Sequence, residues 1–317
     1  MSDTAHTTAG GRRRRTADTA RRVYVTDCEG PLTRNDNALE VAERFIPDGA
    51  EFFARLSRYD DVLADLVRRP GYNAGDTLRL LPPFLKAFEV TDDDIEDFSS
   101  EGVLLVPNAL RTLDRVRRLM PVFIISTSYT PYVMALCELS GFAFDHTRCT
   151  DLRLDRWEMP DDEKRRLRDA VARVLERPLI DVPEGACSLD DLTPRDRETV
   201  ALLDRLFWEE MTGTVGGELL AAVRPVGGGA KLAALKEIVA DLGIAGADVM
   251  YVGDSITDAP ALEAVRSWGG VALSFNGNDY ALAAAEFAAA SPDADVQAQL
   301  ARAFADGGRD SVAAAVR

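Results

Sequence analysis

Two apolar runs, each followed by a pair of carboxylates, lie near opposite ends of this sequence. The first run leads into Asp27 and Glu29, and the second leads into Asp254 and Asp258. Two residues apart in an extended segment, Asp27 and Glu29 leave the chain on one face. Because open parallel α/β sheets bind ligands at the carboxyl ends of their strands, the two pairs are expected to converge. Four acids repel one another unless a cation lies among them, and oxygen ligands select Mg²⁺ or a similarly hard ion.

Groups that bind phosphate lie between the two carboxylate pairs. The apolar run 121–125 ends in Ser126 and Thr127. Hydroxyl and backbone N–H groups at a strand end, just before a helix, hold phosphate oxygens. Lys231 follows the glycine run 227–229 at the start of a helical pattern and supplies a positive charge for a phosphate. Carboxylate pair, hydroxyl, lysine and second carboxylate pair together predict a phosphoryl-transfer site.

From about Val23 to Phe275 this order of motifs resembles the haloacid dehalogenase (HAD) superfamily of phosphohydrolases. The resemblance implies that Asp27 is the nucleophile that forms an aspartyl-phosphate. It implies that Glu29 is the general acid and then the base, where most relatives have aspartate. The implied phosphate-binding groups are Ser126, Thr127 and Lys231. The implied Mg²⁺ ligands are Asp27, the backbone carbonyl of Glu29, Asp254, and Asp258 either directly or through water.

Glu29 is the departure from the usual pattern, and it is compatible with catalysis. Asp-x-Glu-Gly also occurs in the enolase-phosphatases of methionine salvage, whereas P-type ATPases have a threonine at this position. The longer run 26–38 resembles an archaeal branch labelled energy-converting hydrogenase A subunit R. Asn35 follows the first motif closely and is a candidate for binding an enclosed substrate through its amide, although a turn-forming role is the favoured interpretation.

The spacing of the motifs predicts two insertions in a Rossmann-like α/β core with a parallel sheet. The stretches from Asp27 to Ser126 and from Ser126 to Lys231 are both far longer than one crossover between parallel strands needs. We expect the core to comprise 22–37, 104–154 and 223–317. Residues 38–103 are expected to form a helical cap that closes over the site, and 155–222 a second, mostly helical insertion. Residues 1–21, with four consecutive arginines, are expected to be a disordered arm.

Composition narrows the function classes further. The net charge of −16, from 37 basic and 53 acidic residues, argues against a general nucleic-acid surface. No apolar run approaches the roughly 20 residues that span a membrane. The four cysteines have no paired metal spacing, which favours a reduced, cytoplasmic protein.

The expectation from sequence is therefore a Mg²⁺-dependent phosphatase that releases phosphate from a small soluble monoester through an aspartyl-phosphate. A phosphomutase or phosphotransferase with the same motifs is one alternative, and a non-catalytic assembly subunit is another. A homo-oligomer is left open. The expected partner is a small phosphorylated metabolite, with neither nucleic acid nor membrane.

Overall fold

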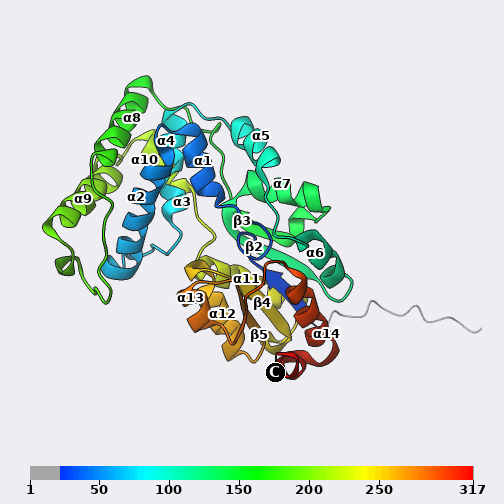
Figure 1. The fold of residues 1–317 in the computed structure, drawn as a ribbon. Helices are drawn as coiled ribbons and strands as arrows, with labels where there is room; N and C mark the ends of the chain where they lie inside the picture. The colour runs from blue at the N-terminus through cyan, green and yellow to red at the C-terminus, as the bar shows by residue number, and fades with distance from the viewer. Residues whose placement is uncertain (1–21, 317) are drawn as a thin grey trace, which may run out of the picture.

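The computed structural model describes residues 22–316, in which a parallel sheet is flanked by helices and joined to a separate group of helices (Figure 1). The strands are β1 (Val23–Thr26), β2 (Val122–Tyr129), β3 (Thr147–Thr150), β4 (Val249–Gly253), β5 (Val271–Phe275) and β6 (Phe287–Ala289). Their order is β3-β2-β1-β4-β5-β6, and every neighbouring pair is parallel. The predicted α/β, Rossmann-like fold class is confirmed. The arm predicted at 1–21 lies outside the described residues.

Helices cover both faces of the sheet, as a parallel sheet requires. Adjacent residues of β1 point to opposite sides: Tyr24 packs into one apolar core and Val25 into another. One face is covered by α6 (Ala109–Arg117), α7 (Thr130–Ser140) and α14 (Asp295–Ala315). The other is covered by α11 (Gly229–Leu242), α12 (Ala259–Ser267) and α13 (Asp279–Ala284). The short helices beside the sheet are η2 (Phe144–His146), η5 (Gly246–Asp248) and η6 (Ile256–Asp258).

One expected strand boundary is wrong, and one alanine-rich segment departs from its helix propensity. In the alanine-rich segment 280–290, α13 ends at Ala284 and Phe287–Ala289 form β6. Pairing with the edge of β5 outweighs the helix propensity of alanine there. Ser126 and Thr127 were expected after the end of a strand, yet β2 continues to Tyr129. Because β2 extends this far, Ser126 and Thr127 lie within the strand and their hydroxyl groups point to opposite faces of the sheet.

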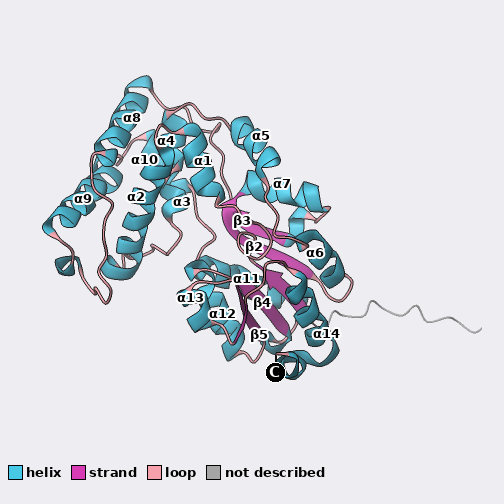
Figure 2. Cartoon of the chain, in the orientation of Figure 1, coloured by secondary structure: helices cyan, strands magenta, loops and turns pink. Residues whose placement is uncertain are grey.

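The remaining helices form a second body, named here the helical body (residues 37–102 and 161–222), and Figure 2 shows that no strand enters it. Its first part contains α1 (Asn37–Phe45), α2 (Gly49–Asp61), η1 (Val62–Val67), α3 (Thr77–Leu80), α4 (Pro82–Ala87) and α5 (Asp92–Gly102). Its second part contains α8 (Asp161–Leu175), η3 (Leu189–Asp191), α9 (Pro194–Arg205), η4 (Leu206–Glu210) and α10 (Val215–Ala222).

The two parts of the helical body share one hydrophobic core. Phe207 of η4 stacks on Tyr59 of α2 with ring centroids 5.9 Å apart, and it meets the edge of Phe84 of α4 at the same distance. The Trp208 indole N–H donates to the Tyr59 hydroxyl at 2.8 Å. Segments expected as two insertions therefore pack as one unit, while the proposed domain boundaries stay a prediction.

The start of α5 is stabilised by a capping box within its own segment. Thr91 is its N-cap, and the Thr91 hydroxyl accepts a hydrogen bond from the Asp94 backbone N–H, while the Asp94 carboxylate accepts one from the Thr91 N–H. This reciprocal pairing satisfies two backbone donors at the helix start. Across residues 22–316, no helix is both long and apolar enough to cross a membrane.

Candidate active site

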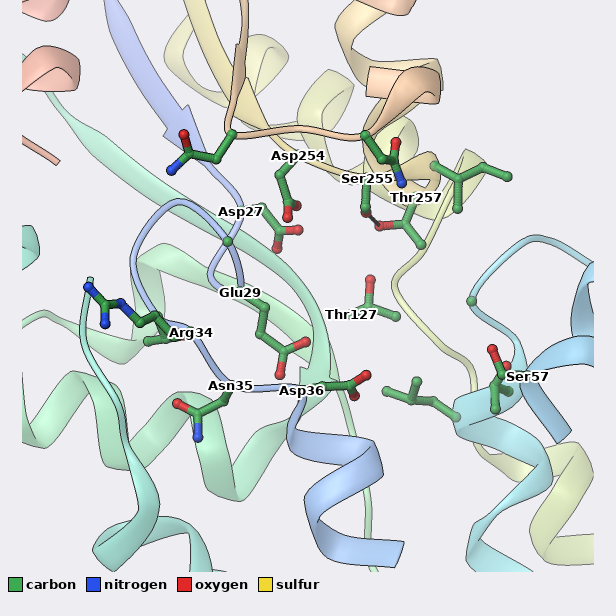
Figure 3. Close-up of a pocket in the computed structure, with 18 of the residues that line it drawn as sticks. Asp27, Glu29, Arg34, Asn35, Asp36, Ser57, Thr127, Asp254, Ser255 and Thr257 are labelled. Atoms are coloured by element: carbon green, nitrogen blue, oxygen red, sulfur yellow. Dashed lines mark hydrogen bonds between the residues drawn. The ribbon is translucent and has the colours of Figure 1, made fainter. Parts of the chain in front are cut away.

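A cavity of about 750 Å³ lies between the carboxyl edge of the sheet and the helical body. Asp27 follows β1 and Asp254 follows β4, and these adjacent strands flank the point where the strand order reverses. Figure 3 shows the two carboxylates side by side, with Thr127 of β2 below them. Ser57 of α2 lies across the cavity from them. The reversal of strand order is where open α/β sheets bind ligands.

Lys231 is the centre of the charge network at this edge. It is fully buried, and its Nζ donates to Asp27 Oδ2 at 2.6 Å and to Asp258 Oδ1 at 2.8 Å. Burial by itself lowers the pKa of Lys231, but the two carboxylates outweigh it and raise that pKa above its ordinary value. Lys231 is therefore a permanent positive charge beside Asp27, whose Oδ1 accepts from the Cys28 N–H at 2.7 Å.

Asp258 positions its neighbours. It is fully buried, and its Oδ1 accepts from the Tyr251 hydroxyl at 2.8 Å as well as from Lys231. Its Oδ2 accepts from the backbone N–H groups of Asp254 and Ser255 at 3.1 and 3.2 Å. Burial alone raises the pKa of Asp258, yet Lys231 and the Tyr251 hydroxyl hold it below the usual range. Of the two predicted modes for Asp258, these contacts favour the one through water, because direct coordination would compete with them.

Asp254 has no such partners and is suited to bind a metal ion. Within residues 22–316, no basic side chain forms an ion pair with it, and burial together with Asp258 raises its pKa to about 7. Oxygen atoms of Asp27, Asp254 and Asp258 lie within 4.8 Å of one another. Three carboxylates against one lysine leave excess negative charge in a poorly solvated place, which a hard divalent cation offsets. The residues present therefore fit Mg²⁺.

Gly30 completes the wall around Asp254. Its φ of +87° lies in the left-handed region, and a Cβ at this position would overlap the Asp254 carboxylate. The turn from Cys28 to Thr33 is closed by the Leu32 and Thr33 N–H groups, which both donate to the Cys28 carbonyl at 3.0 Å. Only glycine brings the backbone this close to the carboxylate.

Glu29 points away from the Asp27 and Asp254 pair toward Asp36 (Figure 3). Its Oε1 accepts from the Asn37 N–H at 2.7 Å, at the first residue of α1. Burial raises the pKa of Glu29 to about 8, although the Asn37 N–H opposes the shift. A carboxyl group with this pKa is protonated at neutral pH, as a general acid must be.

Replacing Glu29 by glutamine is expected to lower turnover about 10²–10⁴-fold on esters with poor leaving groups, and less on an activated aryl phosphate. Glu29 is protonated below its pKa of about 8, so the rate at which Asp27 is phosphorylated in the wild-type protein should fall as pH rises through that value. A cation bound nearby would move this alkaline limb to lower pH. Glu29→Gln should abolish the limb and accumulate phosphoenzyme, because the attacking water lacks its base. Equal losses on both esters, with an unchanged pH profile, would instead show that Glu29 is structural.

The structure places Thr127, and not Ser126, in the cavity lining. Ser126 is 1% exposed, and its Oγ donates to Ser128 Oγ at 3.0 Å and accepts from the Ser128 N–H at 3.1 Å. The Thr127 hydroxyl donates to the Val226 carbonyl at 3.2 Å. The difference follows from β2, because consecutive residues of a strand point to opposite faces. The predicted phosphate contact of Ser126 stays a prediction, and Thr127 has the better position.

Asn35 lines the cavity with its amide fully engaged. Its Nδ2 donates to the Glu40 carboxylate at 2.8 Å and to the Gly102 carbonyl at 2.9 Å. Its Oδ1 accepts from the Leu104 N–H and the Tyr132 hydroxyl, both at 2.8 Å. The predicted substrate contact would have to displace one of these bonds. The Asn35 amide therefore holds together the two chain segments that connect the helical body to the core, one around Asn35 itself and one from Gly102 to Leu104.

Sequence reasoning missed several groups at this site. Tyr251 was treated only as part of an apolar strand, although its hydroxyl holds Asp258. Ser57, Asp60 and Thr77 of the helical body line the cavity and carry no local motif.

The fold can be compared with solved structures. A structure of the gene product AF1437 from Archaeoglobus fulgidus is 32% identical, with 92% of this chain and 85% of that chain covered and a TM-score of 0.79. Phosphoserine phosphatase with bound substrate is 13% identical, with 88% and 97% covered and a TM-score of 0.52. The phospho-aspartyl intermediate analogue of phosphoserine phosphatase is also 13% identical, with 88% of this chain and 98% of that chain covered and a TM-score of 0.52.

The core of this chain thus shares its fold with phosphoserine phosphatase. The chain belongs to the same family as the A. fulgidus AF1437 gene product. No protein-family model and no curated protein matches the sequence. The narrower resemblance to the hydrogenase-labelled archaeal branch stays a prediction.

Proposed function

We propose that this protein is a Mg²⁺-dependent phosphatase that hydrolyses a small phosphate monoester through an aspartyl-phosphate on Asp27. The observation that carries the proposal is the buried Lys231, which joins Asp27 to Asp258 while Asp254 is left without a basic partner beside them. Such an arrangement binds a cation and a phosphate together, because each offsets the charge of the other. The shared fold with phosphoserine phosphatase supports the same class of reaction.

The chain's own residues account for both chemical steps. A carboxylate oxygen of Asp27 attacks phosphorus, the bond to the leaving oxygen breaks, and that oxygen takes the proton of Glu29. Glu29, now ionised, removes a proton from water as the water attacks the acyl phosphate, so that phosphate leaves and Asp27 is regenerated. Lys231 stabilises the negative charge of the transferring group throughout. Mg²⁺, held by Asp27, Asp254 and the Glu29 carbonyl, would supply further charge neutralisation.

The helical body limits the proposed substrate to small molecules. Gly75 of the helical body lies against the core at this site, since a Cβ on Gly75 would be 3.0 Å from Thr257 Cγ2 and 3.4 Å from Thr127 Cγ2. A cavity of about 750 Å³ encloses a metabolite. We therefore propose a cytoplasmic enzyme acting on metabolites rather than on nucleic acid, and the net charge of −16 favours the same choice.

Phosphate release should be measured with Mg²⁺ on small monoesters, a phosphopeptide and a folded phosphoprotein side by side. The small esters are expected to be turned over and the phosphoprotein to be excluded, because the helical body covers the site. Comparable rates on the phosphoprotein would refute the small-metabolite assignment. Loss of ester without accumulation of free phosphate would identify a mutase or phosphotransferase. Inactivity on every ester would favour the assembly subunit.

A further inference from the structure

The half of the cavity formed by the helical body is acidic. Asp60 and Asp61 of α2 line it together with Asp36, which directly precedes α1, and Arg34 is the one basic residue among the described residues of the cavity lining. Asp61 is paired with the exposed Arg58 at 3.3 Å, and Asp36 caps α1 by accepting from the Leu39 N–H. These two carboxylates therefore already have partners. Asp60, by contrast, has no ion-pair partner among residues 22–316.

Asp60 is a buried carboxylate without a positive partner. It is 4% exposed, and no ion pair to it occurs among residues 22–316. Its Oδ2 accepts from the Gly75 N–H at 2.9 Å, but its Oδ1 is buried and has no hydrogen-bond partner in the described part of the chain. The Tyr72 hydroxyl lies nearby and lowers the pKa of Asp60, but it forms no hydrogen bond of standard geometry in the described part of the chain and carries no positive charge. Burying a carboxylate is costly unless a positive charge or donor compensates it.

A second metal ion is not the best candidate for that charge. Among the described residues, Asp27, Asp254 and Asp258 are the one group of three acidic or metal-ligating side chains close enough to share an ion. Phe53 and Leu78 line the cavity beside Asp60, and they suit the carbon skeleton of an organic ligand. A compact ammonium group donates up to three hydrogen bonds and matches a single carboxylate.

We propose that the substrate's leaving group carries an ammonium nitrogen, which Asp60 binds while the phosphate occupies the site at Asp27. The substrate class is then a phosphate monoester of an amino alcohol or amino sugar. This inference rests on the proposed phosphatase function and adds the identity of the group that the helical body recognises. Burial raises the pKa of Asp60 to about 7, so the carboxylate is easily neutralised until a cation binds beside it.

Matched substrate pairs test the proposal on the unmodified protein. Glucosamine 6-phosphate is compared with glucose 6-phosphate and N-acetylglucosamine 6-phosphate, and phosphoethanolamine with ethylene glycol monophosphate. Because a hydrogen bond to a charged group contributes about 1.5–3 kcal/mol, kcat/KM should be at least about tenfold higher for the ammonium member. Equal rates within a pair, or a preference for 2-phosphoglycolate, would overturn the proposal while leaving the phosphatase function intact. If even an aryl phosphate is not hydrolysed, the proposed function fails and the inference fails with it.

Variants then locate the preference. Asp60→Asn should reduce the ratio of kcat/KM within each pair toward one, mainly by raising KM for the ammonium member. Glu51→Gln removes the same charge from an exposed position of the same helix and should preserve the ratio. A ratio unchanged in Asp60→Asn would refute the role of Asp60. If that variant does not fold, the N-acetyl comparison decides, because acetylation removes the charge from the substrate instead.

Discussion

Replacement of Asp27 by asparagine is expected to lower turnover by about four orders of magnitude or more, the scale typical of removing a covalent nucleophile. Asparagine keeps the size of the side chain and can keep the bond from the Cys28 N–H, but it removes the attacking carboxylate. It also replaces the 2.6 Å ion pair between Lys231 Nζ and Asp27 by a contact between the Lys231 ammonium and an uncharged amide. Lys231 would retain Asp258 as its partner, so the fold should survive.

Turnover of an aryl phosphate and mass spectrometry of the acid-quenched protein measure this effect. Wild type should carry phosphate on the peptide that contains Asp27, and the variant should not. Asp145→Asn is a matched control, because Asp145 is exposed and precedes β3 at the opposite edge of the sheet. An Asp27→Asn variant that keeps wild-type turnover, or a phosphopeptide elsewhere in the chain, would exclude the proposed mechanism.

Removal of the metal ion is expected to abolish activity, and added Mg²⁺ should restore it. The carboxylates of Asp27, Asp254 and Asp258 face a single lysine, so a phosphate dianion brought to this site without a cation would be repelled. Asp254→Asn should reduce activity to the level of the metal-depleted protein. Hydrolysis that persists in excess chelator would contradict the assignment.

Thermal unfolding offers a readout that does not depend on turnover. Mg²⁺ should raise the melting temperature of wild type in proportion to its binding, and much less that of Asp254→Asn. The pKa of Asp254 is raised from 3.8 to about 7 in the folded protein. Its contribution to metal-free stability is therefore fully present below 3.8 and lost as pH rises to about 7. Metal-free Asp254→Asn should thus be more stable than wild type at neutral pH, and a less stable variant would show that Asp254 supports the fold in another way.

The fold class and the edge of the sheet at which the candidate site lies could be predicted from sequence because their signals are local. An apolar run followed by a carboxylate specifies both the strand and the point where its side chain emerges, as Asp27 and Asp254 show. The element boundaries were less predictable. The end of β2 depends on pairing with β3, which extends to Tyr129 and Thr150. That pairing gives Thr127, and not Ser126, its place in the cavity.

By itself, the sequence determined the parallel α/β architecture and the order of Asp27, Lys231 and the pair Asp254 and Asp258 along the chain. Only the tertiary structure decided that residues 37–102 and 161–222 share one core, that the Asn35 amide is fully bonded, and that Asp60 is buried without a cation. The physical reason is range. Strand propensity and motif spacing act over a few residues, whereas burial and hydrogen-bond satisfaction depend on segments that meet only after folding, such as Tyr59 with Trp208 and Asp60 with Gly75.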